Sequence, residues 1–158
     1  MTTYANDKDY LKSLTILYVE DEEDIFNSGV RLLSKYSSTL LTARNGREGL
    51  EFFQAHSPDI IITDIKMPIM DGLTMIGEIR KINWFVPIIL LTAFENTDYL
   101  MRAIDANVDK YLTKPTDVTR LIECITNCAH NLRIERELKE SEERLRQMFH
   151  GSDRKSVV

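Results

Sequence analysis

Five side chains that can do chemistry follow short apolar runs of the chain, and they are Glu20, Asp21, Asp64, Thr92 and Lys114. Three carboxylates held close together raise one another's pKa and destabilise a site unless a positive charge intervenes. Mg²⁺ suits such a site, because it takes oxygen ligands and binds through one or two carboxylates plus a phosphate. A lysine ammonium is a compact charge that can pair with a phosphoryl oxygen. The set could hold a phosphoryl group, with one carboxylate acting as the nucleophile that forms an acyl phosphate.

Each of these residues alone is a weak signal. An aspartate after a strand more often forms a turn or caps a helix, and the pair Lys114-Pro115 by itself indicates only a loop. The prediction depends on suitable residue types recurring at four different strand ends of one inferred sheet.

The elements that must position these residues alternate along the chain. The segments "LTILYV", "TLLTA", "DIIIT", "IILLT" and "DKYLT" are predicted strands, and segments with apolar residues at helical spacing follow them. The runs "IIIT" and "IILLT" are apolar without alternation, as expected for parallel strands covered on both faces. Right-handed crossovers then give a doubly wound α/β sheet.

The carboxyl ends of the strands form the ligand-binding edge of such a sheet. Glu20 and Asp21 follow the first strand, and Asp64 ends the third. Thr92 ends the fourth strand, and Lys114 follows the fifth. We therefore expect all five side chains at one edge.

Four segments of the chain resemble the signatures of the response-regulator receiver domain, the phosphoacceptor module of two-component signalling. They are "ILYVEDEED", "IIITDIKMPIMDG", "IILLTAF" and "ANVDKYLTKP", and the resemblance covers residues 14–128 in order and spacing. It implies a flavodoxin-like, five-stranded parallel sheet of order 2-1-3-4-5, with the last helix extended at the C-terminus. It also implies a signalling module rather than an enzyme.

The resemblance implies a role for each residue of the acidic group. Asp64 would accept phosphate from a histidine kinase or a phosphotransfer protein. Asp21, Asp64 and the main-chain carbonyl of Lys66 would ligate Mg²⁺ or Mn²⁺, and Glu20 would act through a water molecule. Lys114 would pair with the phosphoryl group and with Asp64.

The resemblance also implies a switch. The hydroxyl of Thr92 would move to the phosphoryl oxygen, and the ring of Tyr111 would turn inward into the space vacated. The backbone of Lys66 and of Ala93 would bind the phosphoryl group, and the bond from Lys114 to its proline is expected to be cis. From composition alone, Tyr111 is a half-buried aromatic residue of a strand.

The chain departs from the family pattern at two positions. Glu20 stands where many relatives carry aspartate, and its longer side chain should still reach a metal-bound water. Asn107 stands where glycine is common, and asparagine tolerates a left-handed turn. Phe94, two residues after Thr92, is bulky, so we hypothesise that it shields the phosphoryl group and slows self-dephosphorylation.

Composition limits the classes of partner. The net charge is −5, so we expect no direct contact with nucleic acid, which needs a basic surface. No apolar run is long enough to cross a bilayer and the first residues lack a signal core, so we predict a cytoplasmic chain. Cys124 and Cys128 could form half of a metal site with His130, but two small residues on an inner helix face explain them better.

The chain is predicted to have four parts: a lead-in (1–12), the receiver domain (13–130), a helical extension (131–150) and a disordered tail (151–158). The extension carries an apolar stripe, made of Ile134, Leu138, Leu145 and Met148. A solvated helix and a coiled-coil homodimer both fit this stripe, which Ser141 interrupts. A homodimer through the last two α/β units is a further alternative. The segment "ESEERLRQMFHGS" also resembles the entry to a PAS sensory domain.

Three rival functions stay open. A receiver-shaped adaptor that is never phosphorylated has the same fold, although the intact acidic residues argue against it. A flavodoxin-like cofactor protein would need a hydroxyl- and glycine-rich loop after the first strand, where this chain has "VEDEED". An aspartyl phosphatase would need a second aspartate two residues after the nucleophile, and Lys66 occupies that position.

Overall fold

The structure is a computed structural model of the 158-residue chain. It describes residues 2–93, 96–115 and 117–157, with side chains described from residue 7 to residue 150 outside these gaps. Five strands alternate with helices. The strands are β1 (Thr15–Val19), β2 (Thr39–Ala43), β3 (Ile60–Asp64), β4 (Ile88–Thr92) and β5 (Lys110–Thr113). The helices are α1 (Thr2–Ser13), α2 (Glu23–Leu33), α3 (Gly46–His56), α4 (Gly72–Ile82), α5 (Thr97–Asp105) and α6 (Val118–Val157).

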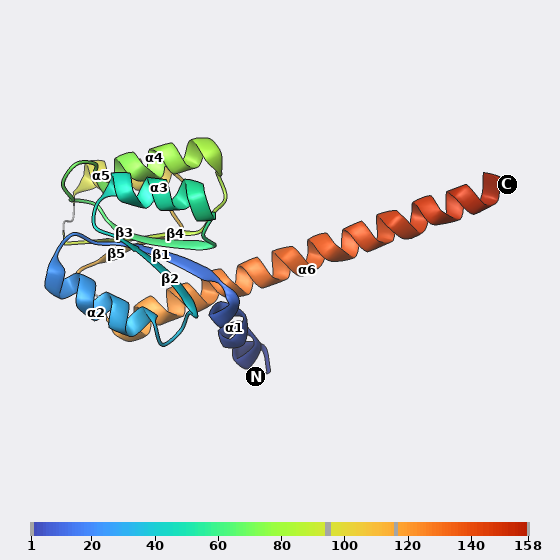
Figure 1. Cartoon of the computed structure of the whole chain (residues 1–158), viewed down its shortest axis with the longest axis horizontal. Coiled ribbons are helices and arrows are strands. Elements are labelled where there is room, and N and C mark those ends of the chain that lie inside the picture. Colours follow the sequence, from blue (N-terminus) through green and yellow to red (C-terminus); the bar gives the residue numbers. More distant parts are fainter. Residues whose placement is uncertain (1, 94–95, 116, 158) are drawn as a thin grey trace.

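The strands form one parallel sheet in the order β2-β1-β3-β4-β5. Figure 1 shows α3, α4 and α5 on one face of the sheet and α2 with the first part of α6 on the other. The predicted doubly wound fold and strand order are confirmed. All four strand ends that carry the candidate residues therefore meet at one edge.

Alternation along the central strands divides the core into two layers. Ile60 and Ile62 of β3 face α2 and α6, whereas Ile61 faces α3 and α4. All three side chains are fully buried. Burial of such side chains contributes roughly 1.5–3 kcal/mol each, so both layers of helices are held firmly to the sheet.

Local polar contacts set where the elements begin. Asn45 accepts a hydrogen bond from the Glu48 amide and Asp71 accepts one from the Thr74 amide, which caps the N-termini of α3 and α4. The carboxylate of Asp109 accepts a hydrogen bond from the amide of Ile88 at 2.7 Å. Asn107 has a φ of 57°, the left-handed conformation that the sequence led us to expect.

The N-terminal residues form a helix where we expected only a lead-in. Helix α1 packs against α6, with Leu11 fully buried between them and the sheet. Asp7 is 4 % exposed and contacts Nδ1 of His130 at 3.0 Å and Nη2 of Arg133 at 2.9 Å. We call Asp7, His130 and Arg133 the α1–α6 clamp. His130 thus pairs with a carboxylate rather than with the cysteines.

The two cysteines are free and buried on the inner face of α6, as the simpler explanation predicted. They pack against α1, α2 and the sheet in the same apolar layer. Burial raises the pKa of Cys128 to about 12, which favours the neutral thiol.

Helix α6 runs far beyond the sheet (Figure 1). The apolar stripe of four residues at 134, 138, 145 and 148 is exposed to solvent along this projecting part. We expected a disordered tail from residue 151, whereas helix α6 continues to Val157. The division of the chain into four parts stays a prediction. Within the described residues, no helix is both long enough and apolar enough to cross a membrane.

Candidate functional site

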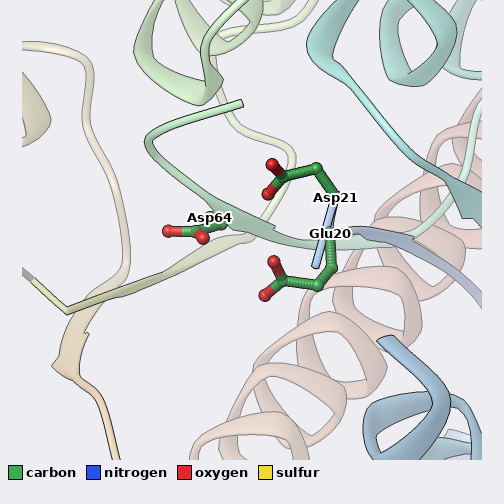
Figure 2. Close-up of side chains that lie close together, drawn as sticks. All are labelled: Glu20, Asp21 and Asp64. Atoms are coloured by element: carbon green, nitrogen blue, oxygen red, sulfur yellow. The ribbon is translucent and has the colours of Figure 1, made fainter. Parts of the chain in front are cut away.

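Three carboxylates meet at the edge of the sheet. Glu20 and Asp21 lie in the loop after β1, and Asp64 is the last residue of β3. Figure 2 shows their side chains around one small space. One oxygen from each carboxylate lies within 4.8 Å of the others, and among the described residues this is the one acidic or Cys/His group with such spacing. The register of the parallel strands thus brings together residues 44 positions apart, as the sequence predicted.

Lys114 reaches the same site from the loop after β5. Its Nζ donates hydrogen bonds to Oε1 of Glu20 at 2.5 Å and to Oδ2 of Asp64 at 3.1 Å. The side chains of Lys114, Glu20 and Asp64 are 12 %, 1 % and 14 % exposed. Charges this well shielded interact more strongly than surface charges. The peptide bond from Lys114 to Pro115 is cis, as expected.

Burial and charge act on the site in opposite directions. Burial raises the pKa of Glu20, and the nearby Asp64 charge adds to this rise against the effect of Lys114. Burial lowers the pKa of Lys114, but the hydrogen bond to Glu20 and the charges of Asp64 and Glu20 outweigh it, so that its pKa lies above the usual value. Lys114 is therefore a firmly held cation among carboxylates whose negative charge exceeds its own.

The loop after β3 is shaped by a glycine. A Cβ atom at Gly72 would lie 1.9 Å from the carbonyl oxygen of Asp64, and the Gly72 amide donates to the carbonyl of Ile65 at 2.7 Å. Asp64 Oδ1 accepts a hydrogen bond from the amide of Ile65 at 2.7 Å. Ile69 has a φ of 72°, which is strained for a β-branched residue. Lys66 lies in this loop, and its proposed role as a carbonyl ligand stays a prediction.

The predicted switch residues lie on neighbouring strands. Thr92 ends β4 and is fully buried, whereas Tyr111 in β5 is half-buried. The register pairs Leu90 with Tyr111, so Tyr111 and Thr92 lie on the same side of the sheet because residues two apart share a face. Tyr111 lines a cavity of about 420 Å³ beside α5. Ala93 follows β4 and is exposed, and Phe94 lies outside the described residues.

The sequence analysis did not identify Arg44 as a residue of this site. Arg44 follows β2, and its Nε donates to the carbonyl oxygen of Glu20 at 3.1 Å. Its Nη2 donates to the carbonyl oxygen of Asp21 at 2.9 Å. The same question that identified the other site residues, namely which side chain follows each strand, would have found it.

The donor set fits a hard divalent cation. Three carboxylates carry more negative charge than Lys114 neutralises, and all the donor atoms are oxygens. Oxygen-only sites favour Mg²⁺, Ca²⁺ or Mn²⁺ over softer metals. The same cation would attract a phosphoryl group, because the metal and Lys114 could share its negative oxygens.

A family comparison matches the model described as "Response regulator receiver domain" over residues 16–126. The transcriptional regulatory protein PdtaR of Mycobacterium tuberculosis is 35 % identical over 126 residues, which cover 79 % of this chain and 61 % of that protein. The response regulator MprA of Mycobacterium ulcerans is 34 % identical over 110 residues, which cover 70 % of this chain and 47 % of that protein. The chain thus matches less than two thirds of the length of these relatives.

Solved structures agree with the fold. The N-terminal domain of a Wolinella succinogenes protein is 33 % identical with a TM-score of 0.74, covering 78 % of this chain and 99 % of that one. A response regulator receiver domain protein from Clostridium thermocellum is 31 % identical with a TM-score of 0.71, covering 77 % and 98 %. A Borrelia burgdorferi CheX–CheY complex with BeF₃ and Mg²⁺ is 21 % identical with a TM-score of 0.67, covering 72 % and 87 %, and supports the fold alone.

Proposed function

The chain belongs to the response regulator receiver domain family, and from this premise we propose that it is a phosphorylation-controlled switch in which Asp64 accepts a phosphoryl group. Receiver domains are typically signalling modules that interact with histidine kinases, so the proposed donor is a histidine kinase or a phosphotransfer protein. The single observation that supports this most strongly is the convergence of Glu20, Asp21 and Asp64 with Lys114 at one edge of the sheet.

The residues divide the proposed reaction among them. A carboxylate oxygen of Asp64 attacks phosphorus, the new O–P bond forms, and the bond to the donor breaks with its electron pair leaving on the donor atom. Lys114 is 3.1 Å from Asp64 and can follow the phosphoryl oxygens as charge builds on them. The backbone amides of Lys66 and Ala93 are proposed to donate to the same oxygens.

Asp21, Asp64 and the carbonyl of Lys66 are the proposed ligands of Mg²⁺ or Mn²⁺, with Glu20 contacting it through water. When bound, the metal ion supplies positive charge that offsets the charge on the transferred group. Glu20 is almost fully buried and accepts a hydrogen bond from Lys114, so it also helps to hold the lysine in place.

The proposed output step uses Thr92 and Tyr111. The buried hydroxyl of Thr92 would move toward the phosphoryl oxygen, and the ring of Tyr111 would turn inward behind it. Tyr111 lines the cavity of about 420 Å³ beside α5, so its ring borders open space on that side. This change would alter the surface formed by α5 and β5, and a partner protein or a second copy of the chain could bind to the altered surface.

Signal transmission through α6 is the second part of the proposal. The α1–α6 clamp holds α6 against α1 at His130 and Arg133. The exposed apolar stripe beyond these residues could pair with the same stripe of a second copy. A PAS-type or other output domain after the helix, and a cytoplasmic location, belong to the same proposal. Sedimentation of the chain with and without the residues after Asn131 tests the dimer.

The experiment that tests the proposed function is incubation with acetyl phosphate and Mg²⁺ followed by intact mass measurement. We expect the wild-type chain to gain one phosphoryl group, and Asp64→Asn or wild type in EDTA to gain none. If the wild type gains none while a known receiver in the same reaction does, an unphosphorylated adaptor becomes the better description.

A further inference from the structure

Arg44 contacts the peptide units that carry two of the three acidic side chains. Its Nε donates to the carbonyl oxygen of Glu20 at 3.1 Å, and its Nη2 donates to the carbonyl oxygen of Asp21 at 2.9 Å. The amide of Glu20 also donates to the carbonyl of Ala43 at 3.0 Å. The end of β2 therefore makes three hydrogen bonds to the backbone of two consecutive residues.

This loop needs such support because it is strongly acidic. Residues 20–24 read "EDEED", five carboxylates in succession. Glu23 and Asp24 lie in the first turn of α2, where the helix dipole stabilises them. Glu20 and Asp21 precede the helix and are crowded further by Asp64, so repulsion tends to push the loop away from β3.

Arg44 is itself held in place. Its guanidinium lies over the ring of Phe26 in α2, 4.2 Å from the ring centroid. Among residues with described side chains, none of the ion pairs involves Arg44. Its guanidinium instead donates to the carbonyl oxygens of Glu20 and Asp21. The guanidinium presents these donors in one rigid plane, which a lysine ammonium cannot reproduce.

We propose that Arg44 is a positioning residue for the divalent cation: its fork holds the Glu20 and Asp21 backbone so that both carboxylates stay directed to the space shared with Asp64. The biological role of this rests on the proposed function above. Outer partners that orient the ligands of a metal ion commonly change its affinity 10–100-fold. Holding the loop in advance means that the cation does not have to order the acidic residues when it binds.

The test is calorimetric titration of the full chain with Mg²⁺ alone. Arg44→Lys keeps the charge and loses the fork, whereas Arg44→Gln loses both. We expect the Kd for Mg²⁺ to rise roughly 10-fold or more in both variants. Arg47→Gln is the matched control, because Arg47 is an exposed cation three residues along the same segment and should leave the Kd unchanged.

Each outcome decides the proposal. A wild-type Kd in Arg44→Lys would overturn it, and so would tighter binding in Arg44→Gln, which would show that the charge of Arg44 only repels the cation. Urea unfolding of the Arg44 variants in EDTA distinguishes a positioning role from a merely structural one. A merely structural role would lower the urea midpoint and leave the Kd for Mg²⁺ unchanged. If Arg44→Gln does not fold, Arg44→Lys alone decides.

Failure of the proposed function would look different. Phosphoryl uptake by the wild type is measured separately, so a wild type that binds Mg²⁺ through Arg44 but gains no phosphoryl group would contradict only the proposed function. Phosphoryl uptake with an unchanged Mg²⁺ affinity in both Arg44 variants would contradict only the role of Arg44.

Discussion

Asp64→Asn should make the metal-free protein more stable, although it removes the proposed functional residue. In the absence of a metal ion, Asp64 is repelled by Glu20 and Asp21 and attracted by Lys114. Asparagine has nearly the same shape and keeps the oxygen that accepts the Ile65 amide. The substitution therefore changes mainly the charge at this position.

The distances decide the sign of the effect. At an effective dielectric constant of about 20, two charges 3.1 Å apart attract by about 5 kcal/mol, which is the Lys114 contact that is lost. The carboxylates of Glu20 and Asp21 each have an oxygen within 4.8 Å of Asp64, so each repels Asp64 by at least about 3.5 kcal/mol. The substitution therefore relieves about 7 kcal/mol of repulsion from the two carboxylates together. Lys114 keeps its 2.5 Å contact with Glu20. The net gain is about 1–2 kcal/mol.

The assay is urea unfolding of both proteins in EDTA and again in excess Mg²⁺. We expect a higher free energy of unfolding for Asp64→Asn in EDTA, and a smaller difference in Mg²⁺ because the wild type gains more from binding the ion. Glu51→Gln, on the exposed face of α3, controls for the loss of one negative charge and should shift the value by less than about 0.5 kcal/mol. A metal-free Asp64→Asn variant less stable than the wild type would refute the reasoning.

Three further predictions concern the rest of the fold. Gly72→Ala should lower the free energy of unfolding in urea by about 2–4 kcal/mol, because the new Cβ would overlap the Asp64 carbonyl and strain the hydrogen bond from the Gly72 amide to Ile65. Gly77→Ala in the same helix meets open space and should raise that free energy by up to about 1 kcal/mol. Equal effects of the two substitutions would contradict the packing argument. The pKa of Asp7 is lowered because hydrogen bonds and charges from the clamp outweigh burial, so its contribution is present above pH 3.8 and lost as pH falls through the lower folded value. Asp7→Asn should accordingly speed amide hydrogen exchange in α1 at neutral pH, and the two proteins should converge in acid; a neutral-pH exchange rate equal to wild type would show that the clamp does not hold α1. Cys128, whose pKa burial raises to about 12, should resist alkylation at pH 8 until urea unfolds the chain, and rapid labelling of the folded protein would disprove its burial.

Much of the site could be predicted because it depends on strand ends. Asp64 and Lys114 lie 50 residues apart, yet a parallel sheet of known order brings the ends of β3 and β5 to one edge. The residue types then indicate the chemistry, since carboxylates and an ammonium suit a metal ion and a phosphoryl group. The same reasoning places Glu20 at this edge, but it did not predict the hydrogen bond that Glu20 accepts from Lys114.

Other features depend on contacts that leave little pattern in the sequence. Helix α1 is mostly polar, and it is held by Leu11 and by the pairing of Asp7 with residues more than 120 positions away. The position of Arg44 directly after β2 could have been noticed, but its contacts are with main-chain carbonyls and no complementary side chain in the sequence indicates them. The left-handed backbone of Ile69 could not be foreseen, because a β-branched residue rarely adopts it.

The most direct test of the central claim is a crystal structure of the chain with Mg²⁺ and beryllofluoride, which imitates a phosphoryl group on a carboxylate. We predict beryllofluoride on an oxygen of Asp64, Lys114 within hydrogen-bond distance of its fluorine atoms, and the cation bound by Asp21 and Asp64. An unmodified Asp64 with no cation between the three carboxylates, in crystals that contain both reagents at saturating concentration, would contradict the account.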